Sequence, residues 1–395
     1  MEIKQYILEQ KDYLIGLRRY FHAHPEPSLQ EYETCRRIEE ELDRDGIPHR
    51  RVGETGVYAW IDGEKGDGKT IALRADIDAL RMQDLKTVSY HSQNEGVCHA
   101  CGHDAHTATL LTAAKVLQQK KGEFSGHIRL FFQQAEEIGA GARIFVKEGL
   151  MKGVDRVYGA HVSSALPAGT VSLTPGPNNA SCDYFRITVT GKGAHVSTPH
   201  LGVDALYIAS QIVVNLQSIV ARRTNPIDTV VVGVGKLTAG TAYNIVAEHA
   251  ELEGTTRCFT PEIRERTNRE VKETAEAIAK LYGAEAGFEL KDFAAPLIND
   301  ADAAREVTKV AEKIYPEGSI IHDQEKRLGA DDFADYLAEA KGVYAFVGTK
   351  NTAKDPNTAS AHHHGLFDLD EEALLGSCNL YVDYAIAYLN GAFDK

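Results

Sequence analysis

The sequence has no long run of apolar residues, which argues against a membrane-spanning helix. Such a helix needs about 20 consecutive apolar residues, and no segment of the chain approaches that length. The N-terminal residues 1–10 mix charged and apolar side chains, so they lack the hydrophobic stretch of a secretory signal peptide. We therefore expect a cytoplasmic protein without a membrane partner.

Cysteine and positive charge are scarce as well. Six cysteines in 395 residues are too few for a disulfide scaffold, and reduced thiols suit the cytosol. Lys and Arg number 43 against 57 Asp and Glu, which gives a formal net charge of −14. Because phosphate backbones are bound by clustered basic residues, we expect no nucleic-acid partner. The charge does not restrict a small-molecule substrate, since a basic pocket can lie inside an acidic protein.

The chain does contain enough apolar sequence for two domains. Hydrophobic residues make up 43% of the 395 positions, and this length exceeds one ordinary core. Helical and strand patterns alternate toward both ends of the chain, which predicts an α/β domain with a largely parallel mixed sheet flanked by helices. The predicted helices are 3–20, 32–45, 105–119, 140–150 and 370–389, and the predicted strands are 70–74, 127–134 and 156–161.

A different pattern lies between these α/β stretches, beyond the turn-rich residues 175–179. It contains predicted strands at 184–190, 229–236, 247–257 and 287–293, with helices at 203–222 and 261–282. The order β, α, β, β, α, β is that of the split βαβ, ferredoxin-like fold. We therefore predict a first domain of residues 1–179 and 295–395, and an inserted α+β domain of residues 180–294.

Candidate metal ligands lie in residues 98–106, which read CHACGHDAH. Cys and His both bind borderline-soft metals. A structural zinc site would need a second ligand pair at matched spacing, and the sequence has none. A redox thiol is a further alternative, and any single histidine is more often a satisfied core or surface residue. The density of the cluster favours metal binding.

Two acids and further histidines follow predicted strands. Glu136 and Glu137 come after strand 127–134; a helix N-terminus attracts such acids through its dipole. A hydrolytic metal site instead needs one carboxylate on the metal and another that handles protons. His161 ends strand 156–161, whereas the histidine run 362–364 has a simple explanation as a surface feature. Ligands gather at the carboxyl ends of strands in such sheets, where these acids and His161 lie.

Five segments together resemble a known family. They are LRADIDAL at 73–80, HACGHD at 99–104, the pair Glu136–Glu137, GAHV at 159–162 and GAH at 193–195. In this order, and over essentially the whole chain, they look like the aminoacylase/carboxypeptidase metallohydrolases. The most similar branch holds N-acyl-amino-acid amidohydrolases, hippurate hydrolases and indole-acetyl-amino-acid hydrolases. The resemblance implies that the first domain is catalytic and that the inserted domain serves as a lid and dimerisation domain.

The resemblance also implies two divalent metal ions per subunit, either zinc or manganese, with cobalt or nickel as alternatives. The implied ligands are Cys101, His103, Glu137, His161 and one C-terminal histidine. Cys101 would bridge the ions as a thiolate, which a coordinated metal stabilises. Asp76 would orient a metal ligand from the next layer of residues.

The C-terminal ligand depends on the register of the histidine run. The family places this ligand four residues before an aromatic residue, and counting back from Phe367 selects His363. His362 and His364 stay open, because Gly365 stands where the family usually has proline.

Other departures from the family pattern lie near the predicted site. Arg81 stands at a usual proline and Cys98 at a usual methionine, but neither change removes a candidate ligand. His22 and His24 match a family segment that ends a helix just before Pro25. The helix dipole and the proline stop explain these two histidines as structural.

The resemblance finally implies a mechanism. Glu136 acts as general base toward the attacking water and then protonates the leaving nitrogen. His195 stabilises the developing oxyanion, often in the partner subunit's active site, while Asn244 and Arg257 bind the substrate carboxylate. The expected enzyme is a homodimer that hydrolyses the amide bond of N-acyl-amino acids. The alternatives are a metallo-carboxypeptidase or dipeptidase on the same scaffold, and a metal- or ligand-binding protein without catalysis. Glu136 beside Glu137 argues against the last of these.

Overall fold

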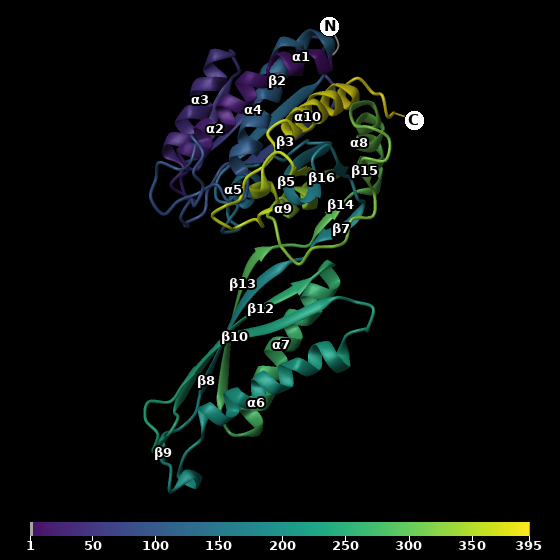
Figure 1. Cartoon of the computed structure of the whole chain (residues 1–395). Coiled ribbons are helices and arrows are strands. Elements are labelled where there is room, and N and C mark those ends of the chain that lie inside the picture. Colours follow the sequence, from purple (N-terminus) through teal and green to yellow (C-terminus); the bar gives the residue numbers. More distant parts are fainter. Residues whose placement is uncertain (1–2, 395) are drawn as a thin grey trace. The chain divides into compact units, whose positions relative to one another are not determined.

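The computed structural model describes residues 3–394 and divides into two compact units (Figure 1). Unit 1 consists of the described residues up to Gly176, Ile298–Glu325, and those from Asp332 onward. Unit 2 consists of Pro177–Leu297 and Lys326–Asp331. The main boundaries lie within a few residues of the predicted ones. Nothing in the sequence predicted that segment 326–331 joins unit 2. It does so because Arg327 exchanges backbone hydrogen bonds with Asn178 (2.8 Å) and Ala180 (3.0 Å).

Unit 1 is built on an eight-stranded mixed sheet with the order β1-β2-β4-β3-β5-β16-β6-β15. The four neighbouring strands β4, β3, β5 and β16 are parallel to one another, and antiparallel pairs occur toward the edges. This arrangement confirms the predicted fold class. The strands are β1 His49–Val52, β2 Gly56–Asp62, β3 Thr70–Asp76, β4 His127–Gln133, β5 Arg156–Pro167, β6 Val171–Ser172, β15 Ile320–Ile321 and β16 Gly342–Lys350.

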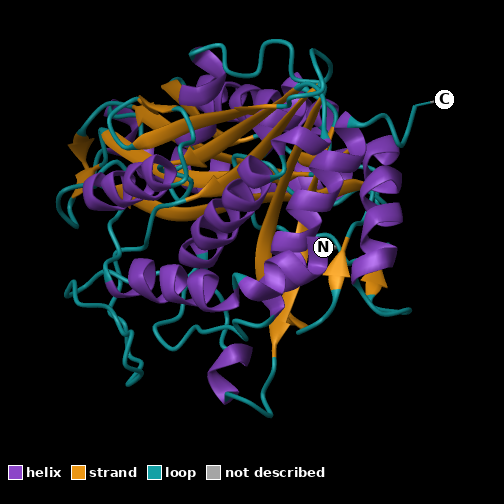
Figure 2. Cartoon of the chain, turned by 90° about the horizontal axis from the view of Figure 1, so that it is seen from above, coloured by secondary structure: helices purple, strands orange, loops and turns teal. Residues whose placement is uncertain are grey.

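Helices cover both faces of this sheet (Figure 2). The main core joins β4 residues Leu130 and Phe132 to apolar side chains of α4 and α10, whereas Phe131 contacts Phe145 of α5 and Tyr336 of α9 on the other face. This division follows from the alternation of side chains along a strand. The helices are α1 Ile3–Glu9, α2 Lys11–Ala23, α3 Tyr32–Arg44, α4 His103–Gln119, α5 Gly141–Lys147, α8 Ala301–Ile314, α9 Ala334–Glu339 and α10 Ala373–Leu389.

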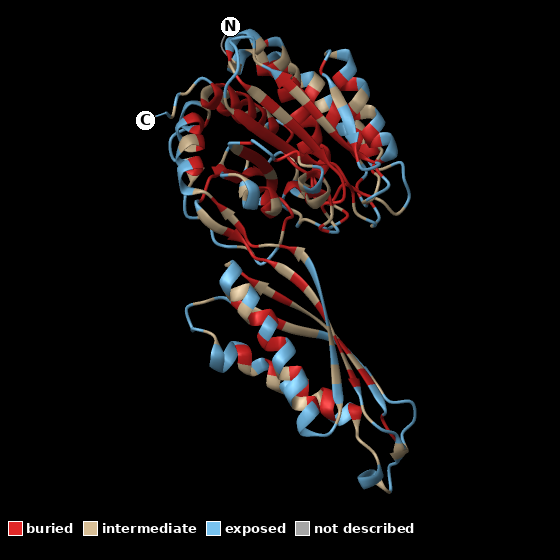
Figure 3. Ribbon diagram, turned by 180° about the vertical axis from the view of Figure 1, so that it is seen from behind, coloured by how far each residue is buried: buried red, intermediate tan, exposed pale blue. Residues whose placement is uncertain are grey.

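Unit 2 contains an antiparallel four-stranded sheet with the order β10-β12-β8-β13. Its core places α6 and α7 against one face of that sheet, and buried residues alternate along its strands (Figure 3). The chain order of these elements confirms the predicted split βαβ pattern. The elements are β8 Cys182–Thr190, α6 Ala205–Ser218, β10 Val230–Ala239, β12 His249–Cys258, α7 Pro261–Leu281 and β13 Glu285–Ala294.

Smaller elements complete the fold. One two-stranded sheet pairs β9 (Ala194–His195) with β11 (Ile245–Val246), and another pairs β7 (Gly176–Asn179) with β14 (Leu297–Asn299). The predicted helix 3–20 is wrong in one respect, because Gln10 separates α1 from α2. Among the described residues, no helix combines the length and the apolar character needed to cross a bilayer.

Candidate metal centre

The predicted ligands of unit 1 converge at the ends of its strands and at the start of α4. Three overlapping groups have all their candidate ligand atoms within 4.8 Å of one another. They are Cys101/His103/His161, Cys101/Glu137/His363 and His103/Glu136/Glu137. Cys101, His103 and Glu137 each belong to two of these groups, so the groups form one continuous cluster. The structure therefore brings together every residue of the implied ligand set, with Glu136 beside it.

Distances within the cluster suit ligands that share an ion. Cys101 Sγ lies 3.4 Å from His161 Nε2, and His363 Nε2 lies 3.4 Å from a Glu137 oxygen. His103 Nε2 is 3.9 Å from the other Glu137 oxygen. Those two last atoms, His103 Nε2 and Glu137 Oε1, are buried and have no hydrogen-bond partner in the protein. Such orphaned atoms are costly unless another group satisfies them, and a metal ion does so.

The tautomers of two histidines also fit metal binding. His103 Nδ1 donates to the backbone oxygen of Asp78 at 2.9 Å, and His161 Nδ1 donates to that of Val162 at 2.6 Å. A neutral imidazole that is protonated at Nδ1 carries its lone pair on Nε2. Both Nε2 atoms face the cluster, so each presents the atom that a metal binds.

The electrostatics of the cluster call for a cation. Burial raises the pKa of the Cys101 thiol well above its usual range, and the carboxylates of Glu137 and Glu136 raise it further. A thiolate at this position therefore requires a nearby positive charge. Burial alone would lower the pKa of His103, but Asp76, Asp78 and Glu137 raise it to about 10. Burial lowers the pKa of His161, and neighbouring histidines add to this effect.

Left-handed backbone at three positions directs the ligand-bearing segments into the site. Gly102 has φ +94°, and a Cβ there would lie 2.4 Å from Val162 Cγ2, so only glycine fits between Cys101 and α4. Ala135 and His363 have φ values of +54° and +61°, which are strained for residues with a side chain. The His363 N–H donates to Ala100 O at 2.9 Å, which places this histidine beside Cys101.

The histidine run resolves into three different environments. His363 faces Glu137, as described above. His362 points its Nδ1 to the backbone oxygen of Cys101 at 3.2 Å and its Nε2 to the N–H of Ser164 at 3.5 Å. His364 Nδ1 accepts the N–H of Leu366 at 3.2 Å. The geometry therefore favours His363 as the C-terminal ligand.

Asp78, to which the sequence assigned no role, braces the site more directly than Asp76. Its carboxylate oxygens accept the backbone N–H groups of Glu136 and Glu137, each at 3.1 Å, and one of them lies 3.3 Å from His103 Nδ1. Asp76 instead binds His106 Nδ1 at 2.5 Å and Arg74 at 2.5 Å. The Asp-x-Asp spacing at the end of β3 was the available signal, but it does not say which aspartate faces which ligand.

The departures from the family pattern lie outside the ligand cluster. Arg81 is exposed and donates to Gln30 at 3.0 Å. Cys98 is buried, and its sulfur lies 3.9 Å from Lys86 Nζ. Close packing explains why glycine stands at position 365 in place of the family's proline, because a Cβ there would approach the backbone oxygen of Gln83 to 2.5 Å.

His22 lies in a buried ionic cluster between α2 and the start of α4. Its Nδ1 is 2.6 Å from Asp104, which also accepts from Arg18 at 3.0 Å. The structural explanation predicted for His22 therefore fits, although the partners are carboxylates rather than the helix dipole. His24 does bond the helix end, through Tyr20 O at 2.8 Å.

The predicted substrate residues lie in unit 2. Exposed His195 pairs with Ile245 across the β9–β11 sheet, and Asn244 O accepts the Val196 N–H at 3.1 Å, so these two residues are neighbours. Arg257 lies near the far end of β12, where its Nη1 donates to Leu328 O at 3.4 Å. Arg257 lies eight positions after His249 along β12, which corresponds to about 25 Å. Asn244 comes five positions before His249, so its location argues against one chain bringing Asn244 and Arg257 to the same carboxylate.

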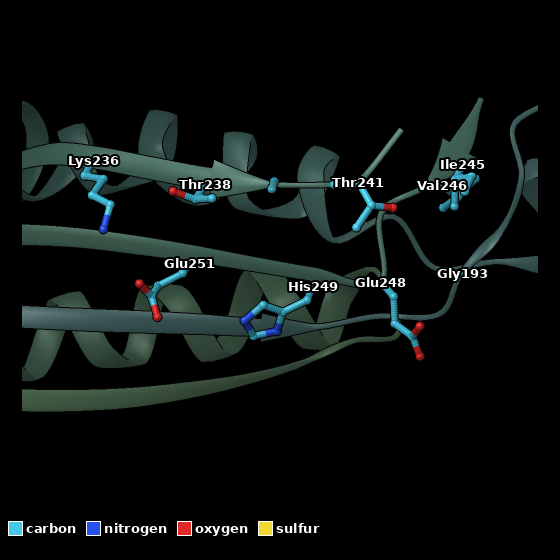
Figure 4. Close-up of a pocket in the computed structure, with 11 residues that line it drawn as sticks. Gly193, Lys236, Thr238, Thr241, Ile245, Val246, Glu248, His249 and Glu251 are labelled. Carbon is cyan, nitrogen blue, oxygen red and sulfur yellow. The ribbon is translucent and has the colours of Figure 1, made fainter. Parts of the chain in front are cut away.

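Unit 2 also has a cavity of about 570 Å³ on the side of β10 and β12 near the β9–β11 sheet (Figure 4). Its polar lining includes Lys236, Thr238, Glu248, His249 and Glu251. None of the predicted substrate residues lines it, so it adds nothing to the proposed chemistry.

Comparisons with known proteins agree with this geometry. The sequence profile of peptidase family M20/M25/M40 matches residues 72–387. An N-acetylcysteine deacetylase of Bacillus subtilis (strain 168) is 37% identical over 378 residues, covering 95% of this chain and 97% of the relative. Thermostable carboxypeptidase 2 of Saccharolobus solfataricus is 36% identical over 394 residues, covering 98% of this chain and 98% of the relative. A solved Bacillus subtilis protein, described as a dinuclear metal binding peptidase from the M20 family, superposes with a TM-score of 0.83. It is 36% identical, covering 96% of this chain and 98% of that one.

Proposed function

The chain belongs to peptidase family M20/M25/M40, and from this premise we propose that it is a metal-dependent amidohydrolase that removes the acyl group from N-acyl-amino acids. The observation that carries the proposal is the Cys, His and Glu cluster of unit 1, which is buried except toward His363, with Glu136 beside Glu137. A protein that only bound metal would need the ligands but not a second carboxylate in this place.

We assign the ligands to two divalent ions. Cys101, His103 and His161 would hold one ion, and Cys101, Glu137 and His363 would hold the other. When bound, such a pair supplies Lewis acidity toward the amide carbonyl and lowers the pKa of a water between the ions. Zinc and manganese both suit this donor set, and cobalt and nickel are alternatives.

Glu136 would move the protons of the reaction. Its side chain is almost fully buried, and one of its oxygens lies 3.9 Å from His103 Nε2, at the edge of the cluster. The bond from its own N–H to Asp78 fixes the backbone from which this side chain projects. Glu136 would accept a proton from the attacking water and return it to the leaving nitrogen.

We infer that the enzyme works as a homodimer through unit 2. If Asn244 and Arg257 bind one substrate carboxylate, we infer that they come from different chains, because Arg257 lies about 25 Å along β12 from His249, the end of the strand nearer to Asn244 in the sequence. His195 would accompany Asn244 into the partner's site. β10 is an edge strand of its sheet, and α6 beside it exposes Leu206, Tyr207 and Val214 by 46%, 46% and 65%. An edge strand and an apolar helix face suit pairing with a second copy.

The dimer can be tested by light scattering after gel filtration. We expect the wild type to have twice the chain mass and Val214→Glu to dissociate, because a charge on that apolar face opposes its burial. Glu276→Ala, an exposed change on α7, should leave the mass unchanged. A monomeric wild type would contradict the homodimer.

The substrate class can be tested with the metal-supplemented enzyme. We expect release of free amino acids from an N-acetyl-amino-acid panel, detected with ninhydrin, and no release after chelation. The carboxypeptidase-like relative favours a second candidate activity, so the same assay should include N-blocked dipeptides and free dipeptides. Faster cleavage of peptides than of N-acetyl-amino acids would select the carboxypeptidase or dipeptidase. No hydrolysis of either class would contradict the proposal.

A cytoplasmic location and a small-molecule substrate remain predictions of the sequence.

A further inference from the structure

His106 is a buried histidine of α4 that the proposed mechanism does not use. It is only 4% exposed, and both of its ring nitrogens are engaged. Nδ1 lies 2.5 Å from Asp76 Oδ1, and Nε2 accepts the backbone N–H of Val162 at 2.9 Å. Since an amide N–H only donates, Nε2 carries the lone pair and Nδ1 carries the proton. His106 therefore has no lone pair for an ion, although it lies close enough to Asp76 and His103 to look like a ligand.

Val162 connects His106 to a metal ligand. The N–H of Val162 is held by His106, and its carbonyl oxygen accepts Nδ1–H of His161 at 2.6 Å. That second bond leaves the lone pair of His161 on Nε2, 3.4 Å from Cys101 Sγ. The pairing of β3 with β5 ends at Arg74 and Gly159, so His106 contacts β5 beyond the last β3 pair, while β16 still pairs with β5 at Val162.

The His106 ring also packs against both of these ligands, His103 and His161. Its centroid lies 5.5 Å from that of His103 and 4.7 Å from that of His161, and the rings of these two ligands are 5.9 Å apart. Packing at Gly102, where a Cβ would meet Val162 at 2.4 Å, presses the start of α4 against the same residue. A smaller side chain at position 106 would thus leave both Val162 and the ring of His161 without support.

We propose that His106 is a positioning residue that carries the orienting effect of Asp76 to the metal ligand His161 through the main chain of Val162. This inference rests on the proposed metal centre and deepens it. Asp78 lies 3.3 Å from Nδ1 of His103. Asp76 lies 3.7 Å from Nε2 of His103 and in addition acts on His161 through His106 and a main-chain link.

The test compares His106→Leu with His106→Gln in the full-length protein. Leucine keeps most of the volume but loses both hydrogen bonds. A glutamine carboxamide offers one donor for Asp76 and one acceptor for the Val162 N–H. Metal content and affinity are measured by elemental analysis and by competition with a chelator, using zinc or manganese alone. We expect His106→Leu to bind the ion held by His161 about 10- to 100-fold more weakly, as expected for loss of a residue that supports a ligand. His106→Gln should restore most of that affinity.

The outcomes separate this inference from the proposed function. Thermal unfolding of the metal-free proteins controls for folding, because a merely structural role would lower stability without weakening one ion selectively. If His106→Leu binds both ions as tightly as the wild type, the inference is wrong. The inference is equally wrong if His106→Gln loses as much metal affinity as His106→Leu. If the leucine variant does not fold, the glutamine variant alone decides, and a metal affinity well below that of the wild type contradicts the inference. A wild type that binds no ions would contradict the proposed function itself, and the inference would fall with it.

Discussion

The proposed metal cluster of unit 1 and the proposed substrate residues of unit 2 are built in opposite ways. Most of the cluster is buried, with His363 at its exposed edge, and His103 and His161 are fixed by hydrogen bonds within one chain. His195 and Asn244 lie instead on a small exposed two-stranded sheet, and Arg257 lies at the other end of β12. A site that binds metal must be pre-organised in each chain. Residues that only complete the site around substrate can come from a second chain.

We expect the largest effect from a substitution of Glu136, the proposed general base of the cluster. We predict that Glu136→Gln retains two ions but loses roughly 10²–10⁴-fold in kcat, since general-base catalysis contributes that much. The check combines elemental analysis with hydrolysis of an N-acetyl-amino acid. Glu148→Gln, on the surface after α5, is the control. An active Glu136→Gln enzyme would remove this residue from the mechanism.

Asp78 tests how far the cluster depends on its support. Asp78→Asn places an amide against the N–H groups of Glu136 and Glu137, so we expect metal affinity to fall by about 10- to 100-fold. Competition with a chelator measures the change. Ser28→Ala removes only the hydroxyl that donates to Asp78 at 2.6 Å and should have a much smaller effect. Equal effects of the two variants would show that Asp78 does not position the ligands.

Arg257 tests the substrate side of the comparison. Arg257→Ala should raise KM for a free-acid substrate by about tenfold or more, because a hydrogen bond to a charged group contributes roughly 1.5–3 kcal/mol. The KM for the matching amino-acid amide should not change, nor should metal content. Arg269→Ala, an exposed change on α7, is the matched control. An unchanged KM for the free acid would exclude Arg257 from carboxylate binding.

Complementation gives the smallest signal but addresses the two-chain arrangement most directly. Glu136→Gln and His195→Ala are each expected to be poorly active as homodimers. After dissociation and reassembly as an equal mixture, about a quarter of the wild-type sites should work, because half of the dimers are mixed and each has one complete site. Activity no higher than the sum of the two variants would place His195 in its own chain's site or outside catalysis.

The sequence predicted different parts of the molecule with different success. The α/β and split βαβ patterns were confirmed, because the spacing of apolar residues in the sequence matches the faces that strands and helices bury. The C-terminal histidine could be chosen only by register, and the structure favours His363 through the left-handed backbone that turns it toward Glu137. Such a backbone conformation has no signal in a run of three histidines.

Residues that act through other residues were the hardest to predict. Asp76 and Asp78 are equivalent in sequence, and only the fold reveals that one faces His106 and the other His103. The pairing of Asn244 with Arg257 came from resemblance alone, which does not distinguish one chain from two. Segment 326–331 joins unit 2 through backbone bonds to residues 178 and 180, and long-range pairing of this kind leaves no local pattern.

The most direct measurement is anomalous diffraction from crystals of the protein loaded with manganese or zinc. The account predicts two peaks about 3.5–4 Å apart, with Cys101 between them and Glu136 next to the gap. His103 and His161 should flank one peak, and Glu137 and His363 the other. No anomalous peak among these side chains, or ions bound elsewhere while the cluster stays empty, would contradict the account.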